Sequence, residues 1–351
     1  MRILYGVQGT GNGHISRARV MAKSLKKVGV TVDFLFSGRV AEQYTDMSCF
    51  ADFRVNEGLT FVTEQGKVHL AKTLKQNLAS AILREVNELD VSQYDLVLND
   101  FEPISAWAAK RQQVPSIGIS HQSALCHKVP KQGVTWLDEL LLKHFAPVDM
   151  ALGCHWHHFA CPIMPPFVDV QAISHQHGQL ILVYLPFEDA DEVADFLTPF
   201  DDYQFLVYHR AKPIKPLPEH IRWYGFSRLG FKAHLAECGG VVANAGFELS
   251  SEALTLGKKL MVKPLQGQFE QGANVAALEL LAAGQSMSVL DTGKLRRWLK
   301  APSPKPINYP RTGDELATWL AQGDWQRPQD LCDSLWSQVE LPDNWNYRDD
   351  S

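Results

Sequence analysis

The chain has 351 residues, a net charge of −5 at pH 7, and 45% hydrophobic and 21% charged residues. This length suits two globular domains, and the slightly acidic balance excludes a broad nucleic-acid-binding surface. No apolar run approaches the ~20 residues that span a bilayer, and the six cysteines do not form a small disulfide framework. We therefore expect a cytoplasmic protein of enzyme size.

Strand-like and helix-like segments alternate through the first half of the chain. Apolar runs at residues 2–7 and 30–36 are typical of buried parallel strands. The helix predicted between them has an apolar stripe, with Arg17 on another side of its wheel. Further strands are expected at 94–100, 115–121 and 148–154, and further helices at 103–111 and 135–145. This order predicts a parallel sheet covered by helices.

A proline-rich stretch without clear periodicity, residues 161–179, is interpreted as a linker. The same alternation then restarts. Strands are expected at 179–186, 203–209, 221–225, 239–246 and 258–264, with helices from residue 189, near 231, through 252 and from 270. A last helix precedes an acidic end of the chain.

The predicted fold is α/β, with two tandem Rossmann-like domains that face each other across a cleft. We place the N-terminal domain at residues 1–168 and the C-terminal domain at 169–325, and we allow the helix and tail at 326–351 to cross back to the N-terminal domain. Ligands of such folds bind at the carboxyl ends of the strands. The informative polar residues are therefore those that directly follow strands.

The loop after the first strand is rich in glycine and ends in a histidine. Gly11 and Gly13 precede His14 and a predicted helix, so a ligand can approach the backbone and an anion can meet free N–H groups. No Lys-Ser/Thr pair follows, and the dinucleotide pattern fits only loosely. Three interpretations are open: a phosphate cradle, a turn that presents His14, and an ordinary tight turn.

Two more polar clusters follow strands in the first half. Asp100 and Glu102 end one strand, where a carboxylate could orient the ring of His14 and stabilise its cation. The alternative is an N-cap for the next helix. His121 and Gln122 end the following strand, where they face an acceptor or lie in a surface loop.

The richest polar cluster lies in the second half of the chain. A turn of small residues leads into a helix with hydroxyl and carboxylate side chains, and the next strand is followed by amides and a glutamate. Together they would suit a nucleotide sugar, because a helix N-terminus binds a diphosphate and carboxylates and amides bind hydroxyls. The cluster consists of Asn244, Ala245, Gly246, Phe247, Ser251, Glu252, Gln266, Glu270, Gln271 and Asn274.

At these positions the chain resembles an inverting glycosyltransferase of the class with two Rossmann domains, GT-B. The resemblance is to an uncharacterised prokaryotic group related to the peptidoglycan lipid-intermediate N-acetylglucosaminyltransferase and to UDP-glycosyltransferases. It covers nearly the whole chain. It rests on the glycine-rich loop with His14 and, more specifically, on the donor signature from Gly246 to Asn274.

The resemblance implies a role for each of these positions. His14 would be the general base for the acceptor hydroxyl, with Asp100 as its partner, and Glu252 would accept hydrogen bonds from the ribose. The implied donor contacts are Gly11, Gly13, Phe226, Asn244, Ala245, Gly246, Phe247, Ser251, Glu252, Gln266, Glu270, Gln271 and Asn274. The implied acceptor contacts are Glu102, His121 and Gln122.

The implied reaction transfers a sugar from a nucleotide-diphosphate donor, taken as a UDP-sugar, to an acceptor hydroxyl with inversion. No metal cofactor is expected, because the helix dipole and backbone N–H groups would stabilise the leaving diphosphate. The main alternative is a nucleotide-sugar hydrolase, whose loop Gly11, Gly13, His14 and Arg17 also fit. A nucleotide-sugar 2-epimerase and a non-catalytic binder are further alternatives.

A group of possible metal ligands occurs at residues 154–161: Cys154, His155, His157, His158 and Cys161. Zinc accepts such ligands, but the spacing fits no standard finger and no second ligand pair follows. We prefer a strand end with histidines facing the cleft.

The expected partners are a nucleotide-sugar donor and a saccharide, lipid-linked or small-molecule acceptor, without nucleic acid. Two apolar segments beside basic residues, 136–145 and 294–302, are candidates for weak contact with a membrane surface. The preferred interpretation is that Trp136 and the leucines after it belong to the core.

Overall fold

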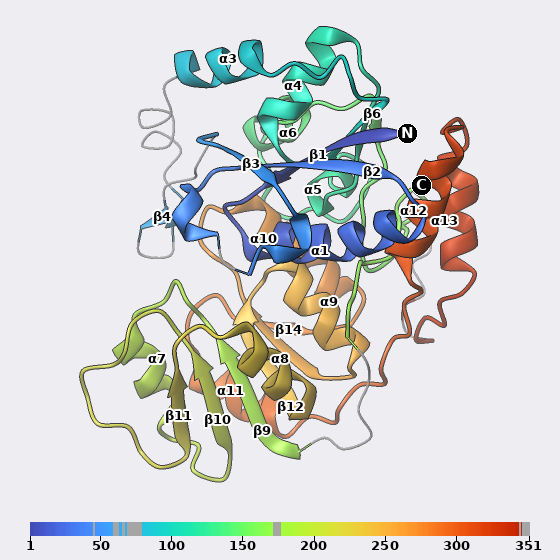
Figure 1. Ribbon diagram of the computed structural model, residues 1–351. Coiled ribbons are helices and arrows are strands. Elements are labelled where there is room, and N and C mark those ends of the chain that lie inside the picture. Colours follow the sequence, from blue (N-terminus) through green and yellow to red (C-terminus); the bar gives the residue numbers. More distant parts are fainter. Residues whose placement is uncertain are drawn as a thin grey trace.

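The structure is a computed structural model, and it describes residues 1–44, 46–58, 63–64, 67–68, 79–170, 177–343 and 345. Each half of the chain forms a parallel six-stranded sheet, and the two halves lie one above the other in Figure 1. The predicted α/β fold with two Rossmann-like halves is confirmed. Residues 171–176 of the expected linker and 346–351 of the tail lie outside the described residues.

The N-terminal sheet has the strand order β3-β2-β1-β6-β7-β8, and each neighbouring pair is parallel. Its strands are β1 (Arg2–Gln8), β2 (Thr31–Ser37), β3 (Phe53–Asn56), β6 (Leu96–Asp100), β7 (Ser116–Gly118) and β8 (Met150–Ala151). A separate antiparallel pair consists of β4 (Thr63–Glu64) and β5 (Lys67–Val68). The helical segments are α1 (Asn12–Lys27), η1 (Ala41–Gln43), η2 (Ser48–Phe50), α3 (Ala79–Glu88), α4 (Pro103–Gln112), α5 (His121–Ala124) and α6 (Trp136–His144).

The C-terminal sheet repeats this topology, with the order β11-β10-β9-β12-β13-β14. Its strands are β9 (His177–Tyr184), β10 (Gln204–Tyr208), β11 (Ile221–Tyr224), β12 (Cys238–Asn244), β13 (Lys259–Lys263) and β14 (Gln285–Ser286). The helices are α7 (Ala190–Leu197), α8 (Arg228–Glu237), α9 (Phe247–Thr255), α10 (Phe269–Leu280), α11 (Thr292–Leu299), α12 (Thr312–Gln322) and α13 (Pro328–Trp336).

The strand register places the sequence motifs at one edge of the N-terminal sheet. Val7 of β1 pairs with Asp100 of β6, and Gln8 pairs with Ser37 of β2. The glycine-rich loop therefore leaves β1 beside the end of β6, at the point where the strand order reverses. In open parallel sheets this is the place where ligands bind.

One apolar core crosses from the N-terminal half into the C-terminal half. Trp156 of the N-terminal half is fully buried, and its ring lies 5.0 Å from the ring of Phe247 at the start of α9. Separate cores lie under α7 and α11 and under α3 and α4. Because a continuous apolar interface resists relative motion of domains, we expect the two halves to keep this arrangement.

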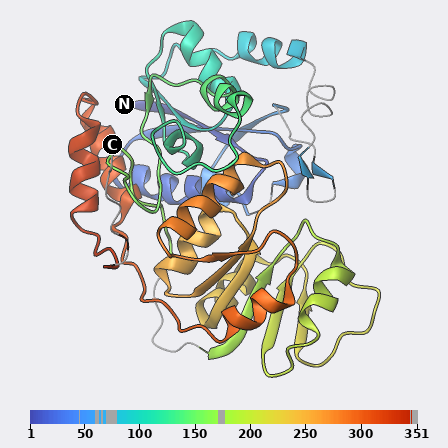
Figure 2. The same cartoon turned by 180° about the vertical axis from the view of Figure 1, so that it is seen from behind.

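The C-terminal helices return to the N-terminal half, as Figures 1 and 2 show. Asp314 of α12 accepts hydrogen bonds from Ser24 at 2.6 Å and from Lys27 at 2.9 Å, both on α1. The indole of Trp336 in α13 donates to the carbonyl of Ile163 at 2.6 Å. The part of the chain that packs back on the N-terminal half therefore begins with α12, before the boundary that we predicted at residue 325.

The two candidate membrane segments differ in exposure. In α6, Trp136 is 72% exposed, and Leu137 and Leu140 are more than half exposed. The expectation that these side chains belong to the core is therefore wrong, since within α6 only Leu142 is buried. In α11, by contrast, Trp298 and Leu299 are buried. Within the described part of the chain, no helix combines the length and apolarity needed to cross a membrane.

Candidate active site between the two halves

His14 lies in the first turn of α1, beside the end of β6. Its Nδ1 is 2.6 Å from Oδ1 of Asp100. Because a carboxylate only accepts hydrogen bonds, Nδ1 carries the proton and Nε2 is the basic nitrogen. The His14 side chain is 12% exposed, whereas Asp100 is fully buried. The structure thus brings together the two residues that the sequence analysis assigned as base and partner.

Arg17 holds the other side of Asp100. Its Nε donates to Oδ2 and its Nη2 to Oδ1, each at 2.7 Å, and the hydroxyl of Tyr5 donates to Oδ2 at 3.3 Å. Burial by itself would raise the pKa of Asp100, but the charges of Arg17 and His14 outweigh it and hold that pKa well below its usual range. Asp100 is therefore an anion with both oxygens fixed.

Glu248, which the sequence analysis did not select, contacts the remaining terminal nitrogen of Arg17. It belongs to the first turn of α9, so the contact joins the two halves. A Cβ on Gly13 would lie 2.7 Å from Cγ of Glu248, so the glycine makes room for this side chain. Two sequence features could have identified Arg17 and Glu248. Arg17 follows His14 by three residues on a helix, and Glu248 is a carboxylate in a first helical turn.

The pKa of Glu248 is raised to about 8 by burial, although Arg17 acts to lower it. Asp100, Glu252 and Glu270 also raise it, because their negative charges face the same space. The carboxyl group of Glu248 therefore keeps its proton to a higher pH than an ordinary glutamate, with a pKa raised to about 8.

The N-terminus of α9 opens onto free space. Gly246 is its N-cap and offers no side chain to the first N–H groups of the helix, and a Cβ built there meets no atom within 4 Å. The buried Asn244 donates to the carbonyl of Lys263 at 2.9 Å, while its Oδ1 has no partner among the described residues. Asn274 donates to the carbonyl of Ala245 at 2.9 Å.

Two of the expected donor side chains instead face the core. Phe247 stacks on His121, with ring centroids 4.0 Å apart and planes 7° apart. Oγ of Ser251 accepts a hydrogen bond from the indole of Trp156 at 2.8 Å and donates to the carbonyl of Phe247. These side chains secure α9 against the N-terminal half, and the predicted donor contacts of both residues stay a prediction.

Glu252 and Phe226 remain partly accessible. The carboxylate of Glu252 is 15% exposed and lies 3.6 Å from Nζ of Lys232. Phe226 is 51% exposed, packs edge-on against Tyr184 at 5.8 Å, and lies 5.9 Å from the guanidinium of Arg210. The structure thus leaves a carboxylate and an aromatic ring open on the C-terminal half.

Gln266 follows β13 and is exposed. It lines a cavity of ≈ 660 Å³ that also contains the ion pair of Glu188 and Lys263, whose charged atoms are 2.8 Å apart. The cavity lies on the side of α7 and α11, whereas Gly246 begins α9.

The predicted acceptor and donor residues contact one another directly. Nε2 of His121 lies 2.6 Å from Oδ1 of Asn274, and Gln122 donates to Glu270 at 2.8 Å. His121 is fully enclosed, and burial lowers its pKa. These contacts close the interface between α5 and α10.

Two other predicted residues are held by backbone groups. Glu102 is fully buried and caps α4, accepting from the N–H groups of Ile104 and Ser105 at 2.9 and 2.7 Å. The expected contact of Glu102 with an acceptor is therefore wrong, and the N-cap alternative holds. Oε1 of Gln271 accepts from the backbone of Leu265 at 2.9 Å, which fixes the loop after β13.

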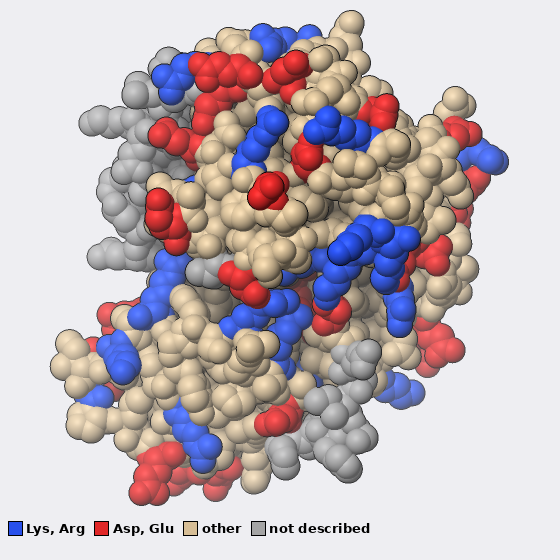
Figure 3. All heavy atoms as spheres, in the orientation of Figure 1, with Lys and Arg blue, Asp and Glu red and all other residues tan. Residues whose placement is uncertain are grey.

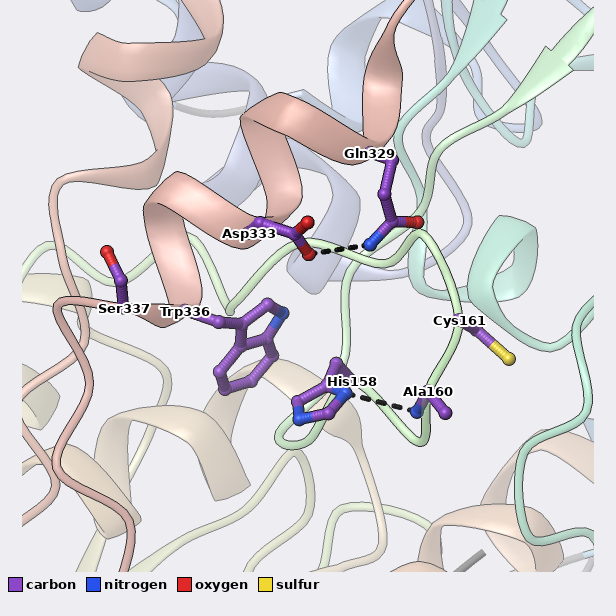
Figure 4. A pocket seen from close by; sticks show the side chains of 7 residues that line it. All are labelled: His158, Ala160, Cys161, Gln329, Asp333, Trp336 and Ser337. Atoms are coloured by element: carbon purple, nitrogen blue, oxygen red, sulfur yellow. Dashed lines mark hydrogen bonds between the residues drawn. The ribbon is translucent and has the colours of Figure 1, made fainter.

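The cysteine and histidine segment does not form a metal centre among the described residues. His155 is fully buried, and its ring packs against Trp156. His158 lines a separate cavity of ≈ 320 Å³ against α13, with Asp333 and Trp336 (Figure 4). The strand predicted at 148–154 is limited to β8, and Cys154 forms an isolated bridge with Met164.

The chain contains one short stretch with two aspartates at the spacing of an Asp-x-Asp metal motif. Asp189 caps α7, accepting from the N–H groups of Asp191 and Glu192. Asp191 accepts from the backbone of Ile214 at 2.9 Å. Both carboxylates thus serve local structure.

Basic side chains gather along the boundary between the two halves (Figure 3). Two ion pairs of 2.7 and 2.9 Å lie there, between Arg228 and Asp46 and between Lys23 and Asp169.

Comparison with known proteins agrees with this arrangement. The profile of glycosyl transferase family 1 matches residues 1–148 and 154–302. The chain belongs to this family. An uncharacterized glycosyltransferase of Methanosarcina acetivorans is 22% identical over 329 residues, which cover 83% of this chain and 84% of that protein.

Solved glycosyltransferase structures share the fold at low sequence identity. The glycotransferase of kitacinnamycin has a TM-score of 0.60 and 14% identity, covering 97% of this chain and 99% of that one. SnogD from Streptomyces nogalater has a TM-score of 0.53 and 17% identity, covering 96% and 99%. VinC in complex with dTDP has a TM-score of 0.51 and 14% identity, covering 95% and 96%. This glycosyltransferase therefore has the GT-B fold.

Proposed function

We propose that this glycosyltransferase moves a sugar from a nucleotide-diphosphate donor to an acceptor hydroxyl with inversion, and that His14 is the general base. The observation that carries the proposal is the hydrogen bond of 2.6 Å between Nδ1 of His14 and the buried Asp100. It fixes the tautomer in which Nε2 is unprotonated.

In the proposed reaction the acceptor oxygen attacks the anomeric carbon from the face opposite the diphosphate. The new bond joins the acceptor oxygen to that carbon, and the bond from the carbon to the diphosphate oxygen breaks. Nε2 of His14 takes the proton of the acceptor hydroxyl, and the leaving oxygen keeps the electron pair. Asp100 stabilises the imidazolium that forms.

The donor diphosphate is assigned to the N-terminus of α9. Gly246 leaves open space there, and the free N–H groups and positive end of the helix dipole favour an anion. VinC was solved with dTDP, which supports a nucleoside diphosphate as the ligand of this fold. We retain the absence of a metal cofactor as part of the proposal, because the helix can stabilise the leaving group.

The nucleoside is assigned to the C-terminal half beside α8. The carboxylate of Glu252, which lies 3.6 Å from Nζ of Lys232, suits two neighbouring ribose hydroxyls, and Phe226 offers an exposed aromatic face to a base. A UDP-sugar remains the proposed donor. The transferred sugar would meet Glu270 and Asn274, whose present bonds to Gln122 and His121 must then be exchanged for sugar hydroxyls.

The exposed apolar face of α6 supports a proposed weak contact with a membrane surface that holds a lipid-linked acceptor. Trp136, Leu137 and Leu140 are exposed on one short helix, and Lys143 lies at its end. An exposed aromatic and aliphatic face suits the interface of a bilayer.

A thermal-shift panel tests the donor assignment. UDP-, dTDP- and GDP-sugars are compared with the free nucleosides at equal concentration. A ligand that binds only the folded state raises the melting temperature, so at least one nucleotide sugar should raise it while its nucleoside should not. If no nucleotide sugar does so, the donor assignment fails. Sugar released at full rate without an acceptor would instead indicate hydrolysis.

A further inference from the structure

Arg17 joins two carboxylates that come from different halves of the molecule. Nε and Nη2 bind the two oxygens of Asp100, and Nη1 contacts Glu248. The side chain of Arg17 is only 2% exposed. A buried guanidinium with all three nitrogens engaged is held in one orientation, because its planar fork allows few other arrangements.

The orientation of Arg17 bears directly on His14. Nη2 of Arg17 lies 3.3 Å from Nδ1 of His14, and both groups share Oδ1 of Asp100. A small rotation of the guanidinium would make it compete with the imidazole for this oxygen. The contact with Glu248 opposes that rotation, since it anchors the opposite end of the fork.

We propose that Arg17 and Glu248 are positioning residues for the His14–Asp100 pair, so that the base is completed only when α9 is docked on α1. Glu248, from the C-terminal half, fixes the guanidinium of Arg17, and Arg17 fixes the carboxylate that orients His14. This inference deepens the proposed function and rests on it for the role of His14.

A purely structural ion pair would predict something different. It would hold the halves together, as Asp46 and Arg228 do at 2.7 Å, without altering the imidazole of His14. The proposal instead predicts that loss of the Glu248 contact changes the tautomer balance of His14 even in a folded protein.

The first experiment reads the His14 tautomer by NMR on the full chain labelled with nitrogen-15 in histidine. The signals are assigned with His14→Gln. The variant Glu248→Leu removes the hydrogen-bond acceptor at similar volume, and Glu248→Gln keeps an acceptor oxygen. In the wild type and in Glu248→Gln, His14 should show the Nδ1–H form, whereas Glu248→Leu should move both nitrogen signals toward a mixture of tautomers.

The matched control is Asp46→Asn, which removes the charge of another ion pair between the halves. Asp46 has a φ of 59°, a conformation that asparagine also tolerates. This variant should leave the His14 signals unchanged. If Glu248→Leu is unfolded by circular dichroism, Arg17→Lys replaces it, since a single ammonium cannot span both carboxylates. Unchanged His14 signals in a folded Glu248→Leu or Arg17→Lys protein overturn the proposal.

The second experiment measures transfer with the nucleotide sugar that gives the largest thermal shift. Glu248→Leu should lower kcat by about tenfold to a hundredfold, as expected for a misplaced catalytic group, with little change in the KM of the donor. Glu248→Gln should restore most of kcat. A raised KM with unchanged kcat would make Glu248 a donor contact and would overturn the positioning role.

The two proposals can fail separately. If His14→Gln keeps full activity while Glu248→Leu still shifts the tautomer of His14, the general-base assignment fails and the positioning network stands. If His14→Gln is inactive and Glu248→Leu leaves the His14 signals unchanged, the general-base assignment stands and the positioning role of Glu248 fails.

Discussion

Arg17 of α1 donates to Glu248 of α9 across the boundary between the two halves. The same guanidinium holds both oxygens of Asp100 at 2.7 Å. The first helix of one half is thus joined to the helix of the other half that begins at an open glycine. The proposed base and the proposed diphosphate site therefore share one set of contacts.

Replacement of His14 by alanine should lower kcat/KM for transfer by about a hundredfold to ten-thousandfold, the usual range for loss of a general base. The melting temperature should change little, because the ring is partly exposed and its single strong partner, Asp100, keeps Arg17. The measurement is initial rate with donor and acceptor. His144→Ala, which removes an exposed histidine of α6, should keep wild-type activity, and equal rates for both variants would remove His14 from the mechanism.

Replacement of Gly246 by valine should leave the fold intact and abolish the thermal shift given by a nucleotide sugar. A Cβ at Gly246 meets no protein atom within 4 Å, and φ is −75°, so we expect the unliganded protein to accept a small side chain there. A diphosphate at the N-terminus of α9 would occupy the same room.

The matched control is Gly178→Ala in β9, where a Cβ also meets nothing within 4 Å. That variant should keep the thermal shift. An undiminished shift in Gly246→Val would place the donor elsewhere.

The titration of Glu248 should make stability depend on pH. Because burial raises the pKa of Glu248 from 4.5 to about 8, the folded protein binds an extra proton between these values. The contribution of Glu248 to the free energy of unfolding is full at low pH and is lost as pH rises through about 8. The slope of the free energy of unfolding against pH is negative between 4.5 and about 8, because in this interval the folded state holds a proton that the unfolded chain has released.

Urea denaturation of the wild type and Glu248→Gln measures this effect. From about pH 5 to about pH 9, the difference between their free energies of unfolding should shift in favour of Glu248→Gln, which has no carboxyl group to titrate there. A constant difference across this interval would show that Glu248 does not titrate in the folded protein.

Removal of the Phe247 ring should destabilise both halves together. Phe247 is 4% exposed and packs against His121 and Trp156 of the N-terminal half. Phe247→Ala should cost about 3–5 kcal/mol, measured by urea denaturation. Ile214→Ala, at a side chain that is 93% exposed, should have almost no effect. Two separate transitions in the wild type would contradict a core shared by the two halves.

Replacement of Trp136 and Leu140 by serine should abolish binding to vesicles that contain anionic phospholipid. Both side chains are more than half exposed on α6, so the folded state should be unaffected. A vesicle sedimentation assay measures the bound fraction, with neutral phosphatidylcholine vesicles as the comparison. Equal sedimentation of the wild type with and without vesicles would exclude the membrane contact.

The sequence determined the fold class and pointed to the edge of the sheet where the candidate site lies. Apolar runs such as β1 and β6 are typical of buried strands of a parallel sheet, and polar residues that follow such strands lie at its carboxyl edge. The sequence led us to expect His14 and Asp100 at this edge, and the structure brings them together because β1 pairs with β6. The sequence also shows that the residue before α9, Gly246, has no side chain with which to cap the helix.

Only the tertiary structure decided which side chains remain free. Phe247, Ser251 and Glu102 looked like ligand contacts, yet packing and capping occupy them, and Trp136 looked like core, yet it is exposed. The helical wheel put Arg17 away from the apolar stripe. Arg17 is nevertheless buried, because Asp100 and Glu248, which are 148 positions apart along the chain, engage its nitrogens. Which residues meet across two domains depends on how the domains dock, and no local sequence pattern encodes that arrangement.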